Sequence, residues 1–238
     1  MNITILISTS PCEKHPSTDM IMETIDSIRY HFANERIIVM ADGIRPEQEQ
    51  LRKRYDQYLL ELTKLLNQSL YGVALDYNWE FRHQAVMTIQ VLKHVDSPLI
   101  LFVEHDTPLL KKKTDWEFIH NAIRFGVVNM VRLYHEELIP HEHHYLMNGR
   151  VGTNLYKTLQ WSQRPHVANR MWYKRLLEAS FRHDSRCFIE DKLYGLIATS
   201  TWEEFKLAIY DPMGTGLDMK RSTNLDGRGA EPKYDQVF

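Results

Sequence analysis

The chain has 238 residues, 43% of them hydrophobic, which is enough for one large domain with a buried core. Its formal net charge of −2 provides no global basic field for nucleic acid, and its two cysteines, far apart in sequence, argue for a reducing compartment rather than a disulfide scaffold. No apolar run approaches the roughly 20 residues that a membrane helix needs. The N-terminus also lacks the basic start and long apolar stretch of a signal peptide, so we expect a cytoplasmic protein.

Strands and helices alternate in the first part of the chain. Apolar, β-rich runs predict strands at 3–7, 37–40, 69–77 (the weakest candidate) and 99–103. Apolar residues at near-helical spacing predict helices at 20–32, 46–66 and 81–95. This order predicts an α/β fold with a mostly parallel central sheet flanked by helices.

A buried strand that ends in two acids is the most informative stretch. Residues 99–103 are five apolar residues in a row, typical of a strand buried on both faces. Glu104 and Asp106 follow, and residues two apart on an extended chain point to the same side, which leaves His105 for packing. Two hard oxygen ligands at the carboxyl end of such a strand favour Mg²⁺ or Mn²⁺, which often carries a diphosphate.

The strand and its triplet Glu104-His105-Asp106 resemble the Asp-X-Asp motif of the GT-A glycosyltransferases, with Glu in place of the usual first Asp. The element order of residues 1–110 resembles the nucleotide-binding half of the same fold. This resemblance implies a GT-A-like (Rossmann-like) enzyme, similar to family 2, that depends on a nucleotide sugar. It further implies that Asp106 ligates the metal directly, and that Glu104 accepts from a ribose hydroxyl or reaches the metal through water.

The resemblance also implies donor contacts outside the triplet. Thr9 and Ser10, after the first strand, would line the nucleoside pocket. Asp42, after the second strand, would accept a hydrogen bond from the base; the alternative is an ordinary Asp-Gly turn. Arg82, near the start of a helix, would contact the donor, although an exposed helix arginine is commonplace.

Histidines and glutamates are dense between residues 135 and 144, in a segment without apolar periodicity. The run His141-Glu142-His143-His144 follows Pro140 and lacks the His-Glu-X-X-His spacing that places two ligands on one helix face. A structural or acceptor-contacting loop is one interpretation, a zinc site another, and a catalytic histidine a third. The zinc interpretation supports a rival hypothesis, a metal hydrolase that needs no nucleotide sugar.

The segment 154–181 is rich in aromatic residues and is expected to shape the acceptor pocket. Stacking on or gripping an acceptor is one role for its rings and cations; packing in the core and on the surface is the alternative. The residues concerned are Trp161, His166, Arg170, Trp172 and Tyr173.

A pair of acids, Glu190 and Asp191, opens a predicted helix and looks like the acceptor-side motif of the family, whose acid serves as general base. The chemistry needs such a group, because an acceptor hydroxyl must lose its proton as it attacks the anomeric carbon. We expect Asp191 to be the base, with Glu190 as second choice. The alternative is that both acids simply favour the helix N-terminus.

The tail, residues 211–238, combines glycines with cations. We expect a lid that closes over the donor and excludes water, with Lys220, Arg221 and Arg228 holding phosphates. The alternative is a disordered C-terminus. Together these features divide one GT-A-like domain, residues 1–238, into a nucleotide-sugar half (1–110), an acceptor half (111–210) and this lid.

The sequence therefore predicts a glycosyltransferase that moves a hexose or pentose from a nucleoside-diphosphate sugar, UDP-linked by preference, with Mn²⁺ or Mg²⁺ and with inversion. The acceptor is a saccharide, a small molecule or a modified nucleobase in DNA. The alternatives are a zinc-dependent hydrolase, a nucleotidyltransferase and a non-catalytic module that binds nucleotide sugar. Residues 8–12 contain no glycine, which counts against the phosphate loop of a nucleotidyltransferase. Oligomeric state is not encoded in any of these patterns.

Overall fold

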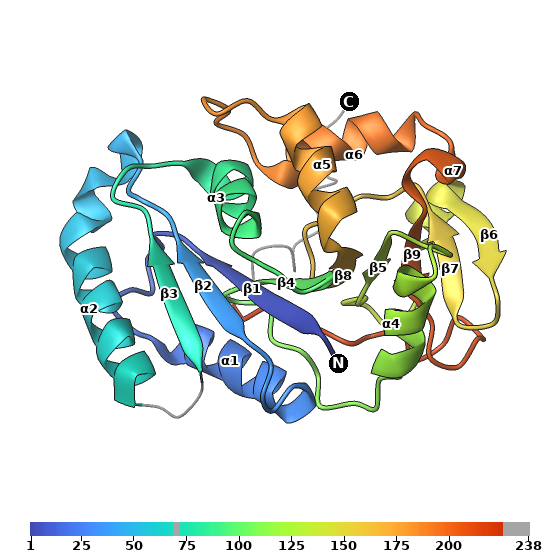
Figure 1. The fold of residues 1–238 in the computed structure, drawn as a ribbon, viewed down its shortest axis with the longest axis horizontal. Helices are drawn as coiled ribbons and strands as arrows, with labels where there is room; N and C mark the ends of the chain where they lie inside the picture. The colour runs from blue at the N-terminus through green and yellow to red at the C-terminus, as the bar shows by residue number, and fades with distance from the viewer. Residues whose placement is uncertain (69–71, 226–238) are drawn as a thin grey trace.

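The computed structural model describes residues 1–68 and 72–225. Within them the chain forms one sheet of nine strands in the order β3-β2-β1-β4-β8-β5-β9-β7-β6 (Figure 1). The strands are β1 (Ile3–Thr9), β2 (Ile37–Ala41), β3 (Val73–Tyr77), β4 (Leu99–Glu104), β5 (Met130–Arg132), β6 (Met147–Val151), β7 (Leu155–Thr158), β8 (His166–Asn169) and β9 (Leu207–Tyr210).

Helices lie on both faces of this sheet. The α-helices are α1 (Asp19–His31), α2 (Arg52–Gln68), α3 (His83–Leu92), α4 (Trp116–Arg124), α5 (Arg170–Ser180), α6 (Ile189–Ala198) and α7 (Trp202–Phe205), and two 3₁₀-helices are η1 (Pro46–Leu51) and η2 (His141–Leu146). None of the helices in the described residues combines the length and the hydropathy that crossing a membrane requires.

The first four strands are parallel, as the alternation of strands and helices predicts. β1 pairs with β2 and β4, and β2 pairs with β3, all in parallel. The carboxyl ends of these strands therefore meet at one edge of the sheet, where Ser8 lies beside Glu104 and Thr9 beside Ala41. This register brings the acidic triplet next to the end of β1.

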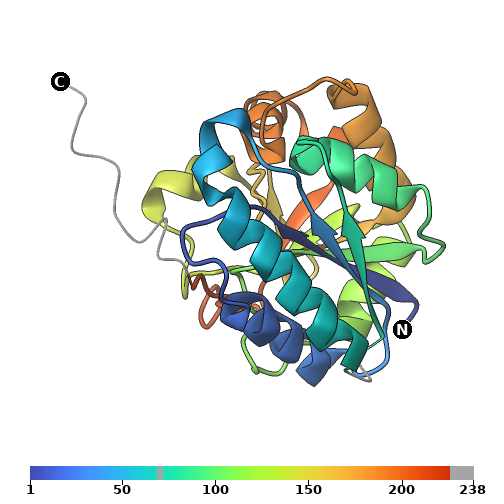
Figure 2. The ribbon, with the colours of Figure 1, turned by 90° about the vertical axis from the view of Figure 1, so that its left-hand side faces the viewer.

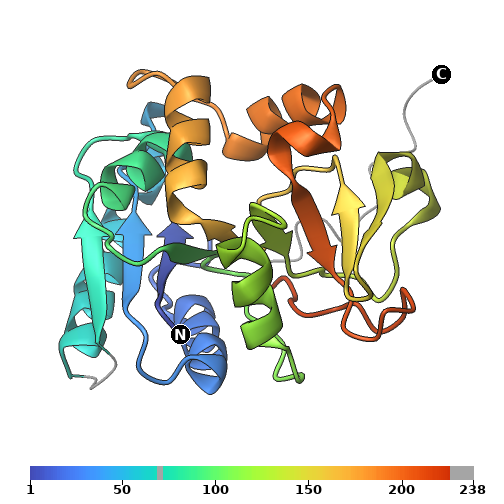
Figure 3. The same cartoon turned by 45° about the vertical axis from the view of Figure 1, so that its right-hand side comes forward.

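The other half of the sheet is mixed. β8 runs antiparallel between β4 and β5, β5 is parallel to β9, and the hairpin β6–β7 extends the sheet antiparallel to β9 (Figure 3). The α/β fold with a large central sheet flanked by helices is confirmed. The sheet is parallel from β3 to β4, and beyond β4 parallel and antiparallel pairs are mixed. Because β8 runs in the reverse direction, its amino-terminal end lies at the edge where β4 ends.

Alternation along the strands divides the core into two layers. Ile5 and Ile7 of β1 pack with α1, α2 and α4, whereas Leu6 packs on the other face with α3, α5 and α6. Figures 1 and 2 show these two sets of helices on opposite faces of the sheet. All five apolar residues of β4 are buried, as expected for a strand that is covered on both sides.

Element boundaries differ from the sequence predictions at a few places. The helix expected at 46–66 begins as η1, where Gln48 leaves helical geometry, and continues as α2. The weak strand candidate at 69–77 is β3 from residue 73, and residues 69–71 lie outside the described residues. Asp115 caps α4, because its carboxylate accepts from the Phe118 amide at 2.9 Å.

Candidate active site

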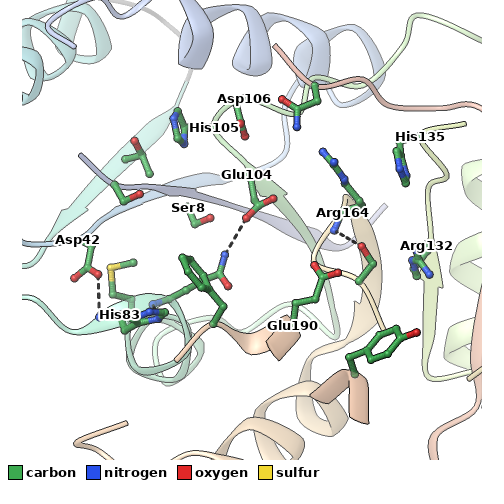
Figure 4. Close-up of a pocket in the computed structure, with 18 of the residues that line it drawn as sticks. Ser8, Asp42, His83, Glu104, His105, Asp106, Arg132, His135, Arg164 and Glu190 are labelled. Carbon is green, nitrogen blue, oxygen red and sulfur yellow. Dashed lines mark hydrogen bonds between the residues drawn. The ribbon is translucent and has the colours of Figure 1, made fainter. Parts of the chain in front are cut away.

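A cavity of about 560 Å³ opens at the edge of the sheet where β1, β2, β4 and β5 end. Its walls also include the first residues of α3 and α6 and the segment that leads into β8. In the view of Figure 4, Asp42 and His83 lie at one end and Arg132 and His135 at the other, with Glu104 and Glu190 between them. The cavity thus occupies the position where open α/β sheets bind ligands.

The acidic triplet is held by a tight turn at the end of β4. The Thr107 hydroxyl accepts from the Glu104 amide at 3.1 Å and donates to the Glu104 carbonyl at 3.0 Å. The Gln84 side-chain amide donates to the Glu104 carboxylate at 3.2 Å. Glu104 and the buried Asp106 both line the cavity. His105 lines it as well, because the chain turns directly after Glu104 and the alternation of an extended strand does not continue through the triplet.

The Glu104 carboxyl is buried close to the Asp106 carboxylate. Burial, and after it the Asp106 carboxylate, raises the pKa of the Glu104 carboxyl to about 7. The Arg164 guanidinium acts in the opposite direction and lowers this pKa, but it does not outweigh burial. A buried carboxyl that is costly to ionise, next to a second acid, is suited to receive a cation.

The donor set fits a hard divalent cation. Carboxylate oxygens are the ligands that Mg²⁺ and Mn²⁺ prefer, and both cations keep positions for water or phosphate oxygens. The open cavity beside Asp106 leaves space for such ligands. Asp106 and Glu104 are therefore the residues that would hold a divalent metal here.

The residues expected on the nucleoside side lie together. Thr9, Ser10 and Asp42 all line the cavity. The Thr9 hydroxyl is buried and lies 3.1 Å from the Tyr58 hydroxyl of α2, within hydrogen-bond distance. Ser10 is exposed on the wall.

Asp42 serves as the cap of α3 from a distant part of the chain. Its Oδ1 accepts from the amides of Gly43 and Arg82 at 2.9 and 2.8 Å, and its Oδ2 accepts from the His83 amide at 2.9 Å. Burial raises the pKa of the Asp42 carboxyl despite these bonds, which stabilise the charged form. Asp42 therefore forms the Asp-Gly turn and also lines the cavity.

Several cations expected around the donor lie away from the cavity lining. The Arg82 guanidinium pairs with Glu80 at 2.7 Å. Arg221 is buried and donates to the Asp218 and Lys220 carbonyls, so it holds a turn rather than facing the cavity. Lys220 is likewise absent from the lining, and Arg228 lies outside the described residues.

One segment of the tail, residues 221–225, runs along the site. Residues 221–225 lie beside the segment that follows the acidic triplet, where the Leu225 amide donates to the Asp106 carbonyl at 2.8 Å. Asn224, from this segment, lines the cavity. The glycine loop 212–216 instead packs on the β6–β7 hairpin, where Gly214 approaches Thr153 of the turn and Gly216 approaches Tyr156 of β7.

The two candidate bases occupy different positions. Glu190 lines the cavity, and its Oε2 accepts from the Gln163 backbone amide at 3.0 Å. Asp191, the next residue in the first turn of α6, is exposed and is not part of the lining. The structure therefore brings Glu190, rather than Asp191, into one cavity with Glu104 and Asp106.

Comparison with solved structures identifies the architecture. TarS residues 1–349 from S. aureus superposes with a TM-score of 0.56, at 13% identity, over 95% of this chain and 61% of that one. GalNAc-T7, solved with UDP, GalNAc and Mn²⁺, gives a TM-score of 0.58 at 11% identity over 100% of this chain and 46% of that one. The chain has the GT-A fold.

A third GT-A structure agrees. The mannosyltransferase PcManGT from Pyrobaculum calidifontis, solved with GDP-Man and Mn²⁺, gives a TM-score of 0.50 at 12% identity over 89% of this chain and 56% of that one. The chain spans about six-tenths or less of the length of these structures. The sequence itself matches no protein-family model and no curated protein sequence.

The GT-A cavity contains polar residues that the sequence patterns did not single out. Arg132 ends β5 and is fully buried, and its guanidinium donates to the Gln160 side chain at 2.9 Å and to the Gln160 carbonyl at 3.1 Å. Arg164 precedes β8 and faces the acids (Figure 4). Arg132 was detectable, because β5 is a buried strand whose carboxyl end meets the same edge. Arg164 was not, because its place depends on the reversed direction of β8.

The aromatic residues expected at an acceptor lie in the core of the GT-A fold instead. Trp161, His166 and Tyr173 are each fully buried, with His166 stacked on Phe102 at 5.4 Å between ring centroids. Trp172 packs partly buried against the same core, and the Arg170 guanidinium donates to the Ser97 carbonyl at 3.0 Å. These side chains support β8 and α5, so the packing alternative describes them.

The histidine-rich run forms η2 on the surface. Within residues 1–68 and 72–225, His141, His143 and His144 belong to no group of three or more metal-ligating side chains. The His144 ring contacts the Ile139 carbonyl at 3.1 Å. His143 lines the cavity, and its Nδ1 lies 3.2 Å from the side-chain nitrogen of Gln160. Nothing in this arrangement favours the zinc interpretation of the run.

Proposed function

We propose that this chain is a metal-dependent glycosyltransferase that moves a sugar from a nucleoside-diphosphate sugar to an acceptor hydroxyl. The observation that carries the proposal is the meeting of Glu104, Asp106 and Glu190 in one cavity at the carboxyl edge of a GT-A sheet. The cavity has acids suited to a cation on one side and a further acid across from them. This combination serves displacement of a diphosphate and fits a mere nucleotide-binding module less well.

The donor is assigned to the β1–β2 side of the cavity. Thr9, Ser10 and Asp42 would contact the nucleoside, and Glu104 would accept from a ribose hydroxyl. A uridine diphosphate carrier is our first choice, supported by the complexes of TarS with UDP-GlcNAc and of GalNAc-T7 with UDP. The complex of PcManGT with GDP-Man keeps guanosine diphosphate as the second choice.

Asp106 and Glu104 would hold Mn²⁺ or Mg²⁺. When bound, the cation supplies positive charge that neutralises the charge growing on the departing diphosphate. The Arg164 guanidinium, which already interacts electrostatically with Glu104, supplies a fixed positive charge on the same side of the cavity. This arrangement stabilises the leaving group without needing the tail cations Lys220, Arg221 and Arg228.

Glu190 is our choice for the general base, with Asp191 as second choice. The hydrogen bond from the Gln163 amide fixes the Glu190 carboxylate on the cavity wall. In the proposed step the acceptor oxygen bonds to the anomeric carbon, the bond from that carbon to the diphosphate oxygen breaks, and the acceptor proton passes to Glu190. Attack on the face opposite the leaving group inverts the anomeric centre.

The acceptor would enter between Glu190 and the polar end of the cavity formed by Arg132, His135 and His143. A saccharide, a small molecule and a modified nucleobase each present a hydroxyl that this space would take. Binding to duplex DNA at two salt concentrations separates the nucleobase from the others, because phosphate contacts impose a steep salt dependence.

Release of nucleoside diphosphate from donor sugars tests the proposal directly. The protein is incubated with UDP- and GDP-linked hexoses and pentoses, with Mn²⁺ or with a chelator, and free diphosphate is quantified. We expect slow, metal-dependent release from one donor with water as acceptor, and faster release with the true acceptor. Release that is independent of metal, or none from any donor over a broad acceptor panel, would remove the proposal.

A further inference from the structure

Three metal-ligating side chains gather beside the acidic triplet but have no part in the proposed reaction. Cys12 and His15 lie in the loop between β1 and α1, and His105 directly follows β4. One ligand atom from each lies within 4.8 Å of the other two. Within the part of the chain that the structure describes, this is the single group of three or more such residues. Figure 4 shows His105 next to Asp106.

The ring of His15 is fixed by stacking. It is 1% exposed and stacks on Tyr58 with 3.9 Å between ring centroids and an interplanar angle of 8°. Tyr55 lies 5.2 Å away at 19°. Both tyrosines belong to α2, and the Tyr58 hydroxyl is within hydrogen-bond distance of Thr9, which connects the stack to the end of β1. Packing therefore sets the plane in which the His15 nitrogens point.

Neither ring nitrogen of His15 has a hydrogen-bond partner. A buried histidine that serves only packing normally directs at least one nitrogen at a carbonyl or hydroxyl, because an unpaired buried polar atom is costly. A hydrogen bond from the Cys12 thiol would meet that need, and the structure contains none.

We propose that Cys12, His15 and His105 bind Zn²⁺, with the fourth position of the tetrahedron open to water. One thiolate and two imidazoles are ligands that Zn²⁺ takes in proteins, whereas the oxygen pair of Glu104 and Asp106 suits a harder cation. Two neighbouring sites would thus select different metals by ligand type. Cys12 is partly exposed, which gives the ion a way in.

Such a zinc site would fasten the wall of the donor pocket. The loop that holds Cys12 and His15 begins directly after Ser10 on the cavity wall, and His105 precedes Asp106. A single ion would tie the end of β1 to the end of β4 through side chains. We expect bound zinc to slow amide hydrogen exchange in residues 10–17 and to raise the midpoint of thermal unfolding, because a ligand that binds only the folded state stabilises it.

Cobalt substitution tests the site with a readout independent of sugar transfer. The full chain is stripped with a chelator and titrated with Co²⁺ in excess Mg²⁺, and the near-ultraviolet charge-transfer band from thiolate to cobalt is recorded. We expect this band to saturate at one equivalent and to vanish on addition of Zn²⁺. Cys12→Ser should abolish the band. His15→Asn should weaken Co²⁺ binding at least about 100-fold, because losing a residue that only orients a metal ligand already costs up to that factor.

Two variants serve as controls. Cys187→Ser removes the other cysteine and should leave the band unchanged, and Asp106→Asn alters the acid pair and should also retain it. Absence of the band in the wild type, its persistence in Cys12→Ser, or its loss in Cys187→Ser would each overturn the proposal. Because Cys12 is partly exposed, its replacement tests the site even if His15→Asn does not fold.

Discussion

At the scale of single residues, helix geometry decides which of two adjacent acids faces the cavity. Successive residues of an α-helix point about 100° apart, so Glu190 and Asp191 do not share a direction. Glu190 accepts from the Gln163 amide inside the cavity, whereas Asp191 faces solvent near His83, whose pKa it raises slightly against the larger effect of burial. The pair therefore provides a matched experiment, in which each acid is the control for the other.

Glu190→Gln should lower the rate of sugar transfer by a factor of about 100 or more, the low end of what a general base contributes, because the amide accepts no proton. Asp191→Asn should change the rate by no more than a few-fold. Binding of the nucleoside diphosphate, measured separately, should be unaffected in both. Equal losses in the two variants, or a larger loss in Asp191→Asn, would assign the base differently.

A buried histidine gives the protein a pH-dependent stability. His166 donates from Nδ1 to the Arg164 carbonyl at 2.8 Å, and burial lowers the pKa of its imidazole to about 4. The folded state thus favours the neutral ring, while the unfolded chain takes up a proton near pH 6.5. This contribution is complete above pH 6.5 and is lost as the pH falls to about 4.

Between pH 7 and pH 5 we expect His166 alone to lower the free energy of unfolding by about 2 kcal/mol. Urea denaturation at a series of pH values measures this, and His166→Gln should show a correspondingly shallower dependence. His144→Gln, on the exposed η2, should leave the dependence of the wild type unchanged. The same pH dependence in His166→Gln and the wild type would refute the assignment to His166.

At the scale of elements, the turn after β2 and the start of α3 hold each other in place. The Asp42 carboxylate accepts hydrogen bonds from the amides of Arg82 and His83, as the side chain of a capping residue does at a helix N-terminus. Gly43 makes the approach possible, since a Cβ there would lie 2.6 Å from the backbone nitrogen of Phe81. His83 adopts a positive φ of 65° at this junction, so the chain is strained where it meets the cavity.

Gly43→Ala should therefore destabilise the protein by roughly 1–3 kcal/mol, the usual cost of overpacking, because the new methyl group meets backbone rather than a movable side chain. It should also weaken nucleotide binding by displacing Asp42. Gly195→Ala is the matched control: it lies within α6 with nothing within 4 Å of the added atom, and should be neutral or stabilising by up to about 1 kcal/mol. Thermal unfolding of both variants checks this, and equal stability of the two would contradict the close packing at Gly43.

At the scale of the whole molecule, the order of strands places every part of the site at one edge. β1, β2 and β4 bring Ser8, Asp42 and Glu104 to that edge, and β5 adds Arg132. Local sequence patterns suffice to predict this half of the site. An apolar run of strand length predicts a buried parallel strand, and the residues that follow the run then lie at the carboxyl edge of the sheet. The acidic triplet and the Asp42 turn were accordingly accessible from the sequence. The acid pair at 190–191 was also accessible, but the choice of Glu190 over Asp191 depends on how α6 is seated at the cavity.

The remaining features depend on contacts that no local pattern encodes. The reversed direction of β8 brings Arg164 to the acids, and the hairpin β6–β7, whose first strand contains Asn148 and Gly149, shows no hydrophobic alternation. The aromatic residues Trp161 and Tyr173 look the same in sequence whether they stack on a ligand or pack in a core. In the group of Cys12, His15 and His105 the first and last residues are 93 residues apart in sequence, and the group exists only once β1 and β4 are paired.

The central claim is that Asp106 and Glu104 hold a metal that binds a nucleoside diphosphate, and calorimetric titration tests it most directly. Uridine, guanosine, adenosine, cytidine and thymidine diphosphates are titrated into the wild type, Asp106→Asn and the surface control Asp184→Asn, each with and without Mn²⁺. We predict that one diphosphate, uridine by preference, binds the wild type and Asp184→Asn at least about tenfold more tightly with Mn²⁺, a difference of about 1.4 kcal/mol, and that Asp106→Asn loses this difference. Binding that is indifferent to Mn²⁺ for all the diphosphates, or a dependence on Mn²⁺ that survives in Asp106→Asn, would contradict the account.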